Sequence, residues 1–306
     1  MENKGIRRIK TISEFHRLNN LPAPEHPLFS IVDYGMVIRP EDIAEMSFVF
    51  DFYQIAIKRG VNAKIKYGQQ EYDFDEGIMS FISHNQILRI EPDSNPTDRQ
   101  SGYLIQIHPC FLRNTSLGKN FKNYEFFQYS VNEALFLSEK EENIINNIIQ
   151  NIQQEYHSNI DKFSQCIVIS QLETLLNYAD RFYQRQFITR KITNHQILDQ
   201  LEKILSDYFK SNKPLENGLP TVQYVADTLH LSASYLSGLL KSLTGQSTQQ
   251  HIQNKLIELA KEKLTTTDLS ISEIAYELGF EYSQSFSKLF KSKTNKSPQE
   301  FRQSFN

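Results

Sequence analysis

The carboxyl-terminal third of this 306-residue chain contains one short helical pattern written twice, and this repeat constrains the fold more than any other feature. The first copy runs from Thr221 to Gly245 and the second from Ser270 to Asn295. Apolar positions before the turn recur 49 residues later, so that Val225 corresponds to Ile274. Apolar positions after the turn recur 50 residues later, so that Leu236 corresponds to Phe286. Such a repeat predicts one supersecondary unit that is built twice.

Each copy predicts a short helix, a tight turn and a second helix. Thr221 gives the start signal of the first copy, and Ser270 followed by Glu273 forms a capping box in the second. Gly279 supplies a turn residue that tolerates positive φ, and His230 takes its place in the first copy. This arrangement is the helix-turn-helix, whose second helix can lie in a major groove of DNA.

Residues 248–264, between the two copies, have apolar residues at helical spacing and predict one linker helix. At a rise of 1.5 Å per residue this helix is about 26 Å long. Successive major-groove faces on one side of a duplex lie roughly 34 Å apart. We therefore expect the linker helix to present both second helices to one side of DNA.

The stretch SISEIAYELGFEYSQSFSKLFKSKTNKSPQEFR resembles the signature of the AraC/XylS-type transcription regulators. It combines the turn, the second helix and the closing helix of that signature in the same order, although Lys255 stands near a usual arginine and Asn295 replaces a usual glycine. The resemblance implies two helix-turn-helix units joined by a long helix. It also implies a homodimeric, sequence-specific regulator in the bacterial cytoplasm, which contacts RNA polymerase if it is an activator.

The exposed faces of the two second helices supply the candidate contacts to double-stranded DNA. Gln can bond an adenine edge, Lys can reach guanine acceptors, and Ser bonds less selectively. The predicted base-reading residues are Ser234, Ser237, Gly238, Lys241, Ser283, Gln284, Ser287 and Lys288. Phosphate contacts position a protein without specifying sequence, and the predicted ones are Lys255, Lys291, Lys293, Lys296 and Arg302.

The charge balance restricts how DNA could be bound. The net charge is −3, and twelve Lys and Arg face twelve Asp and Glu between residues 196 and 306. Affinity must therefore come from local placement of charge and not from bulk attraction. A non-specific architectural DNA binder is one alternative, and it would show a steep salt dependence; the neutral carboxyl-terminal domain argues against it.

Residues 28 to 130 contain short runs rich in Val, Ile, Phe and Tyr, separated by Gly- and Pro-containing stretches. Their spacing predicts an antiparallel sandwich or small barrel. In the AraC-type family this place is commonly filled by a cupin-like barrel that binds a small effector, and YDFDEGIMSFIS looks like a piece of one. We therefore expect an α+β protein whose residues 1–137 form a cupin-like antiparallel β-barrel, the sensor domain.

The candidate effector contacts are polar-tipped side chains in this half of the chain. They are Tyr34, Tyr53, Tyr67, Tyr72, His84 and Arg89. A metal-binding cupin needs paired histidines and an acid, whereas His26, His84 and His108 stand singly. We expect no metal, no cofactor and no enzymatic role, with a cupin-type enzyme carrying an appended helix-turn-helix as the other alternative. The acidic group of Asp73, Asp75 and Glu76 is interpreted as a charged hairpin turn.

Residues 138–187 predict an antiparallel helical hairpin. Ser138 and Glu141 form a capping box, an apolar stripe follows as far as Tyr156, and a second stripe runs from Phe163 to Phe182. The hairpin is expected to pack on the barrel and, as the resemblance favours, to form a homodimer interface. Residues 188–195 are interpreted as a linker and residues 196–306 as the DNA-binding domain, opened by a helix from Asn194.

The sequence carries no sign of export or of a membrane span. The amino-terminal residues are too polar for a signal peptide, and no run of 18 apolar residues occurs. Cys110 and Cys166 are the two cysteines, and we interpret them as reduced thiols of a cytosolic protein without a membrane partner.

Overall fold

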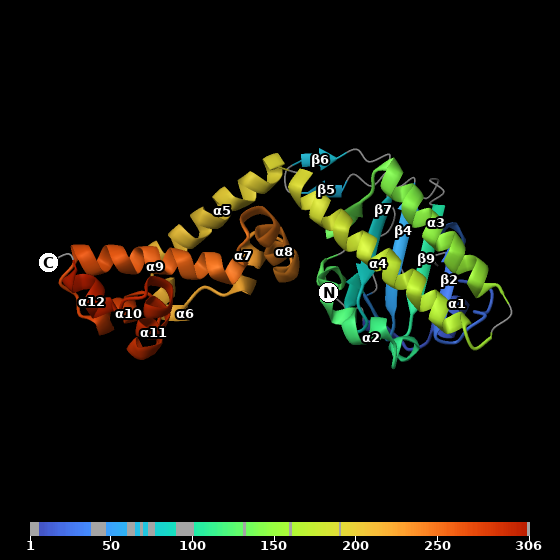
Figure 1. The fold of residues 1–306 in the computed structure, drawn as a ribbon, viewed down its shortest axis with the longest axis horizontal. Helices are drawn as coiled ribbons and strands as arrows, with labels where there is room; N and C mark the ends of the chain where they lie inside the picture. Colours follow the sequence, from blue (N-terminus) through green and yellow to red (C-terminus); the bar gives the residue numbers. More distant parts are fainter. Residues whose placement is uncertain are drawn as a thin grey trace, which may run out of the picture. The chain divides into compact units, whose positions relative to one another are not determined.

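A computed structural model describes residues 6–37, 47–59, 65–67, 70–72, 77–89, 101–130, 133–158, 161–189 and 191–304. The chain divides into two compact units, Met1–Gln186 and Phe187–Asn306. The first unit combines sheets and helices and the second is helical (Figure 1), so the protein is α+β as predicted. Among the described helices, none combines the length and the apolar character that crossing a membrane would need.

The first unit is built around a five-stranded antiparallel sheet with the strand order β10-β7-β4-β9-β2. Its strands are β2 (Phe29–Asp33), β4 (Tyr53–Arg59), β7 (Ile78–Ile82), β9 (Ser101–Ile107) and β10 (Leu135–Phe136). In the central register, Ile57 of β4 lies opposite Met79 of β7 and Tyr103 of β9. The β structure predicted between residues 28 and 130 is thus present in the described part of that segment.

Two smaller sheets complete the strands that the structure describes. A three-stranded sheet joins β1 (Ile6–Ile9), β3 (Ser47–Phe50) and β8 (Ile87–Arg89), and a hairpin joins β5 (Ile65–Tyr67) to β6 (Gln70–Tyr72). β1 runs parallel to β3, so the expectation of antiparallel strands throughout residues 1–137 is wrong for this pair. The described strands therefore form three hydrogen-bonded sheets, one of which is not purely antiparallel.

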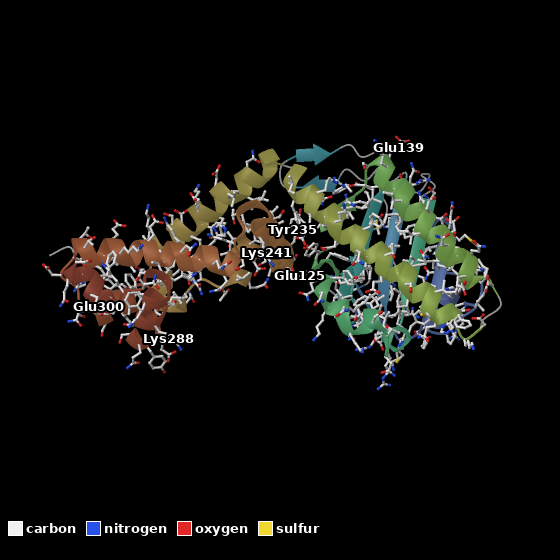
Figure 2. All side chains as sticks on the ribbon, in the orientation of Figure 1. Glu125, Glu139, Tyr235, Lys241, Lys288 and Glu300 are labelled. Atoms are coloured by element: carbon white, nitrogen blue, oxygen red, sulfur yellow. The ribbon has the colours of Figure 1, made fainter. Side chains whose placement is uncertain are left out.

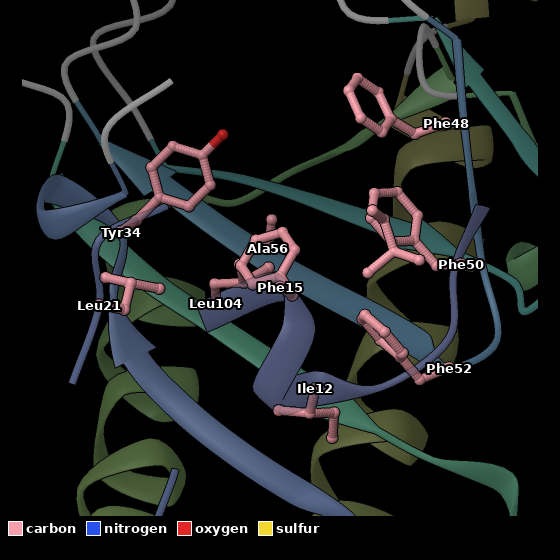
Figure 3. Packing of buried hydrophobic residues seen from close by; sticks show 10 residues of the cluster. Ile12, Phe15, Leu21, Tyr34, Phe48, Phe50, Phe52, Ala56 and Leu104 are labelled. Atoms are coloured by element: carbon pink, nitrogen blue, oxygen red, sulfur yellow. The ribbon is translucent and has the colours of Figure 1, made fainter. Parts of the chain in front are cut away.

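An aromatic core lies between the three-stranded and the five-stranded sheet. Phe48 and Phe50 of β3 lie in one column with Phe52, opposite Phe15 of α1 (Ile12–Leu18) and Ala56 of β4 (Figure 3). The ring centroids of Phe15 and Phe50 are 6.1 Å apart and those of Phe50 and Phe52 are 5.4 Å apart. Edge-on and tilted contacts at these distances are favourable for aromatic rings.

The opposite face of the five-stranded sheet is covered by the helical hairpin α3 (Glu139–Tyr156) and α4 (Ser164–Thr189), as Figure 1 shows. The rings of Phe29 and Tyr156 lie 5.7 Å apart, and those of Phe81 and Tyr183 lie 6.2 Å apart. The capping box predicted between Ser138 and Glu141 is present at the start of α3. Both faces of the central sheet are thus buried.

The second hairpin helix begins later than its predicted apolar stripe, and the start of that stripe is exposed. Phe163 precedes α4 and is 57% exposed, and Ile167 in its first turn is 43% exposed. Burial of the helix begins only at Val168.

Between β9 and α3 the chain forms short turns of helix: η3 (Pro109–Leu112), α2 (Ser116–Asn120), η4 (Phe121–Asn123) and η5 (Glu125–Gln128), while η1 (Tyr34–Met36) follows β2.

The second unit consists of helices joined by short turns. They are α5 (Lys191–Lys210), α6 (Lys213–Asn217), α7 (Val222–Thr228), α8 (Ala233–Thr244), α9 (Thr248–Thr266), α10 (Ile271–Glu277), α11 (Ser283–Thr294) and α12 (Pro298–Gln303). The helix expected from Asn194 already begins at Lys191, and α4 continues to Thr189. The segment interpreted as the linker is therefore largely helical, because it contains no Gly or Pro to end a helix.

Candidate nucleic-acid interface

The two copies of the repeat fold into the same helix, turn and helix. In the first copy α7 is capped by the Thr221 hydroxyl, and the turn places His230 at a φ of +57°. In the second copy Ser270 forms the predicted capping box of α10, and the turn places Gly279 at a φ of +92°. The left-handed turn predicted from one glycine is thus present in both copies, and a histidine adopts it in the first.

The second turn lies directly against the backbone before the first copy. A methyl group built on Gly279 would lie 2.8 Å from the carbonyl carbon of Gly218, well inside contact distance. Glycine is therefore required at this turn both for its backbone angle and for the close approach. The contact fixes the second helix-turn-helix on the loop that follows α6.

The linker helix α9 connects the two copies as one uninterrupted element. Its 19 residues correspond to about 28 Å of helix, slightly more than the sequence predicts. Leu256, Ala260 and Leu264 of α9 pack in one cluster with α10 and α11. Figure 1 shows α8 near the amino-terminal end of α9 and α10 to α12 near its other end.

The second helix of the second copy, α11, has a buried aromatic side and an exposed basic side. Phe286 and Phe290 are fully buried, whereas Gln284 and Lys288 are exposed. Ser283 and Ser287 are half-buried beside them. The helix sequence contains three lysines and no acidic residue, and Figure 2 shows Lys288 at the outer surface of the helical unit.

The second helix of the first copy, α8, offers less polar surface. Leu236, Leu239 and Leu240 are buried as predicted, and Lys241 is exposed. Ser234 and Gly238 are half-buried. The Ser237 hydroxyl lies 3.1 Å from the buried Thr248 hydroxyl at the start of α9. The side chain of Ser237 therefore connects α8 to the linker helix.

The candidate phosphate contacts divide into two groups. Lys291, Lys293 and Lys296 are exposed on α11 and on the turn that follows it. The Arg302 guanidinium instead donates to the carbonyl oxygens of Leu264 at 3.2 Å and Leu269 at 2.7 Å. Arg302 thus holds α12 against the end of α9.

Acidic residues lie near several of the candidate phosphate contacts: Glu300 near Lys291 and Lys296, and Glu258 beside Lys255. Glu300 accepts hydrogen bonds from the backbone and side chain of Ser297, which lowers its pKa, and Lys291 and Lys296 lower it further. Lys255 of α9 is half-buried, with its Nζ 3.1 Å from a carboxylate oxygen of Glu258. Among the described residues Lys288 makes no ion pair.

Two exposed tyrosines of the second copy were not selected from the sequence. Tyr276 on α10 is 63% exposed, and Tyr282 immediately before α11 is 59% exposed. Aligning the two copies could have identified them, because the corresponding residues of the first copy are Asp227 and Ser232. The second copy therefore exposes two aromatic side chains where the first copy has smaller polar ones.

The structure brings together two of the candidate effector contacts. The rings of Tyr53 and His84 stack with centroids 4.8 Å apart. A cavity of about 460 Å³ lies beside Tyr53, with Leu112, Arg113, Lys119 and Phe121 among its lining residues. Burial of the phenol raises the pKa of Tyr53.

The remaining effector candidates lie elsewhere or are not described. Tyr34 is buried in the aromatic core, with the Lys58 Nζ 4.7 Å above its ring, so it does not join Tyr53. The side chains of Tyr67, Tyr72 and Arg89 lie outside the described residues, as do Asp73, Asp75 and Glu76.

The two histidines that border the central sheet have local backbone partners. His26 Nδ1 accepts from the Leu28 N–H at 3.1 Å, and His108 Nδ1 accepts from the Cys110 N–H at 3.2 Å. Within the described part of the chain, no three His, Cys, Asp or Glu side chains gather closely enough to hold a metal ion. Cys110 and Cys166 are exposed thiols without a disulfide.

The repeat geometry agrees with a comparison against protein families, in which residues 225–304 match the model of a helix-turn-helix domain. These residues form a helix-turn-helix domain of the AraC/XylS type. The match begins within α7 and ends just after α12, so it covers most of the first copy, the linker helix and the whole second copy.

Similar proteins carry regulator names. The uncharacterized HTH-type transcriptional regulator YfiF of Bacillus subtilis is 33% identical over 143 residues, covering 47% of this chain and 42% of the relative. The HTH-type transcriptional activator RhaS of an Enterobacter species is 36% identical over 110 residues, covering 36% and 37%. The matches thus span about two fifths of the relatives' own length.

A solved structure is also similar in sequence to part of this chain. The C-terminal domain of AraT, a response regulator from Geobacillus stearothermophilus, is 29% identical. The match covers 35% of this chain and 84% of that chain, with a TM-score of 0.31.

Proposed function

We propose that this protein is a sequence-specific transcription regulator of the bacterial cytoplasm that binds adjacent major grooves with α8 and α11. The observation that most strongly supports this proposal is the pair of helix-turn-helix units, which have matching turns and are joined by the single helix α9. The length of α9, about 28 Å, is comparable with the rise of one turn of DNA, roughly 34 Å. The AraC/XylS-type match over residues 225–304 supports the same function.

Within this proposal the candidate residues take different roles. Exposed Gln284 and Lys288 are the base readers of α11, with Ser283 and Ser287 beside them, and Lys241 is the reader of α8, with Ser234 and Gly238 beside it. Lys291, Lys293 and Lys296 contact phosphates. Ser237, Lys255 and Arg302 have partners within the unit and act mainly by holding its helices in place.

The test begins with selection of a duplex by the full chain from a random-sequence library. Lys288→Ala is expected to weaken binding to the selected duplex by about 5- to 100-fold and to relax base preference at one position, as loss of a base contact does. Lys203→Ala removes the same charge from an exposed position of α5 and is expected to bind normally. Unchanged affinity and base preference in Lys288→Ala would remove that residue from the readers.

We also propose that residues 1–137 form a cupin-like sensor domain whose small effector controls DNA binding, with the cavity beside Tyr53 as its site. Tyr53→Ala should then change DNA binding only when cell extract supplies the effector.

Residues 138–187 are proposed as a homodimer interface, and contact with RNA polymerase follows if the protein is an activator. Exposed Ile167 offers a test: Ile167→Asp should shift the sedimentation of the full chain toward monomer, and an unshifted dimer would exclude this surface.

A further inference from the structure

The start of α11 departs from the pattern of its own unit. Its first residue is preceded by Tyr282, which has extended backbone angles and makes no side-chain hydrogen bond that caps the helix. Five other helices of the unit begin behind a hydroxyl that accepts a backbone N–H: Thr221, Ser232, Ser247, Ser270 and Ser297. Ser and Thr are among the strongest N-cap residues, so a capping hydroxyl is the common solution in this unit.

The first copy of the repeat provides an internal reference for this position. Ser232 stands 50 residues before Tyr282 and starts α8, as the offset of the repeat requires. Its hydroxyl accepts the Tyr235 N–H at 3.2 Å. The Ser232 carbonyl accepts the Leu236 N–H at 3.0 Å, whereas the Tyr282 carbonyl accepts the Ser285 N–H at 3.1 Å and the Phe286 N–H at 3.5 Å. The second copy therefore lacks the capping hydroxyl that the first copy has at this position.

The residue that replaces the cap presents its side chain to solvent. Tyr282 is 59% exposed, so burial of its ring does not compensate the lost cap. A position that breaks a local rule without a gain in packing is often functional. Tyr282 precedes Ser283 and Gln284 directly, at the end of the helix that enters the groove in helix-turn-helix proteins.

We propose that Tyr282 is a further DNA-contact residue, whose phenol hydroxyl donates a hydrogen bond to a phosphate flanking the bases read by α11. Tyrosine hydroxyls are among the side-chain donors that bind DNA phosphates. The inference rests on the proposed function and adds to it a residue that stabilises the complex while it destabilises the folded unit. It predicts opposite changes in thermal stability and in DNA affinity at one position.

The experiment uses the full chain, the duplex selected from the random library, and a scrambled duplex of equal composition. Tyr282→Ser restores the cap found at Ser232, so the Tm of the helical unit should rise by about 3 °C. Its affinity for the selected duplex should fall by about 10- to 150-fold, as loss of one hydrogen bond to a charged group implies. Tyr282→Phe keeps the ring and lacks the hydroxyl, so it should show the same loss of affinity without a change in Tm.

The pattern across the two duplexes separates a phosphate contact from a base contact. A phosphate contact carries no sequence information, so Tyr282→Phe should weaken binding to both duplexes by the same factor, whereas Gln284→Ala should weaken binding mainly to the selected one. Wild-type affinity in Tyr282→Phe would overturn the inference. If Lys288→Ala weakens binding in that same assay, the proposed function stands and only the role of Tyr282 fails; if no duplex is selected at all, the proposed function fails.

Discussion

Single residues decide the turns of this protein, and Gly279 carries the strongest constraint. Gly279→Ala should lower the free energy of unfolding of the helical unit by about 2–5 kcal/mol, because left-handed backbone strain adds to overlap with Gly218. Gly245 is the matched control, since it has a φ of +73° but no atom within 4 Å of an added methyl. Gly245→Ala should cost only about 1–2 kcal/mol. Equal losses in urea unfolding would show that the contact with Gly218 is unimportant.

A buried histidine gives the first unit a pH dependence. His16 is 2% exposed, its Nδ1–H donates to the Pro22 carbonyl at 2.5 Å, and its Nε2 lies 2.8 Å from the Ser30 hydroxyl. Burial lowers the pKa of His16, and the hydrogen bond to the Pro22 carbonyl opposes this only in part.

Because the pKa of His16 is lowered in the folded state, protonation of this histidine favours the unfolded chain. As pH falls below the ordinary histidine pKa, the unfolded chain takes up the proton before the folded one, so stability decreases from about pH 7 toward pH 5. His16→Asn should reduce this dependence, measured as the free energy of unfolding of the first unit at each pH. An unaltered slope in the variant would assign the dependence to other groups.

At the level of elements, helix starts were predictable because a cap is a local signal. Ser270 accepts the Glu273 N–H, and Glu273 accepts the Ser270 N–H in return at 2.7 Å. Ser270→Ala should therefore destabilise the helical unit by about 1 kcal/mol. Ser272→Ala changes an exposed serine of the same first turn and should be nearly neutral. Circular dichroism during urea unfolding compares the two variants, and equal effects would contradict a role for the cap.

Strand pairing was less predictable from the same sequence, because it joins distant segments. The runs around Phe48 and Ile105 were predictable from their composition, but nothing local indicates that Ile6–Ile9 pairs in parallel with Ser47–Phe50. The alternation rule also fails on β9, where Gln106 is as fully buried as Ile105. Its amide nitrogen and oxygen have no hydrogen-bond partner among the described residues. Both faces of this strand are covered, so polarity did not identify an outer face.

On the scale of the whole molecule, the sequence predicted the helical unit in more detail than the first unit. The repeat places each polar side chain of α8 and α11 relative to an apolar residue of the same helix, so Lys288 could be assigned to the exposed face. The repeat could not show that the Ser237 hydroxyl contacts the Thr248 hydroxyl, or that Arg302 donates hydrogen bonds to two backbone carbonyls. Those contacts depend on how α9 crosses the other helices, and that crossing is set by tertiary packing.

The central claim is that α8 and α11 bind neighbouring major grooves on one side of a single duplex. Methylation interference at guanine N7, with the full chain bound to its selected duplex, tests this claim most directly. Two interfering segments should appear with centres about 10–10.5 base pairs apart on one face of the duplex. Lys288→Ala should weaken the interference in one segment only. A single interfering segment, or two segments on opposite faces of the duplex, would contradict the account.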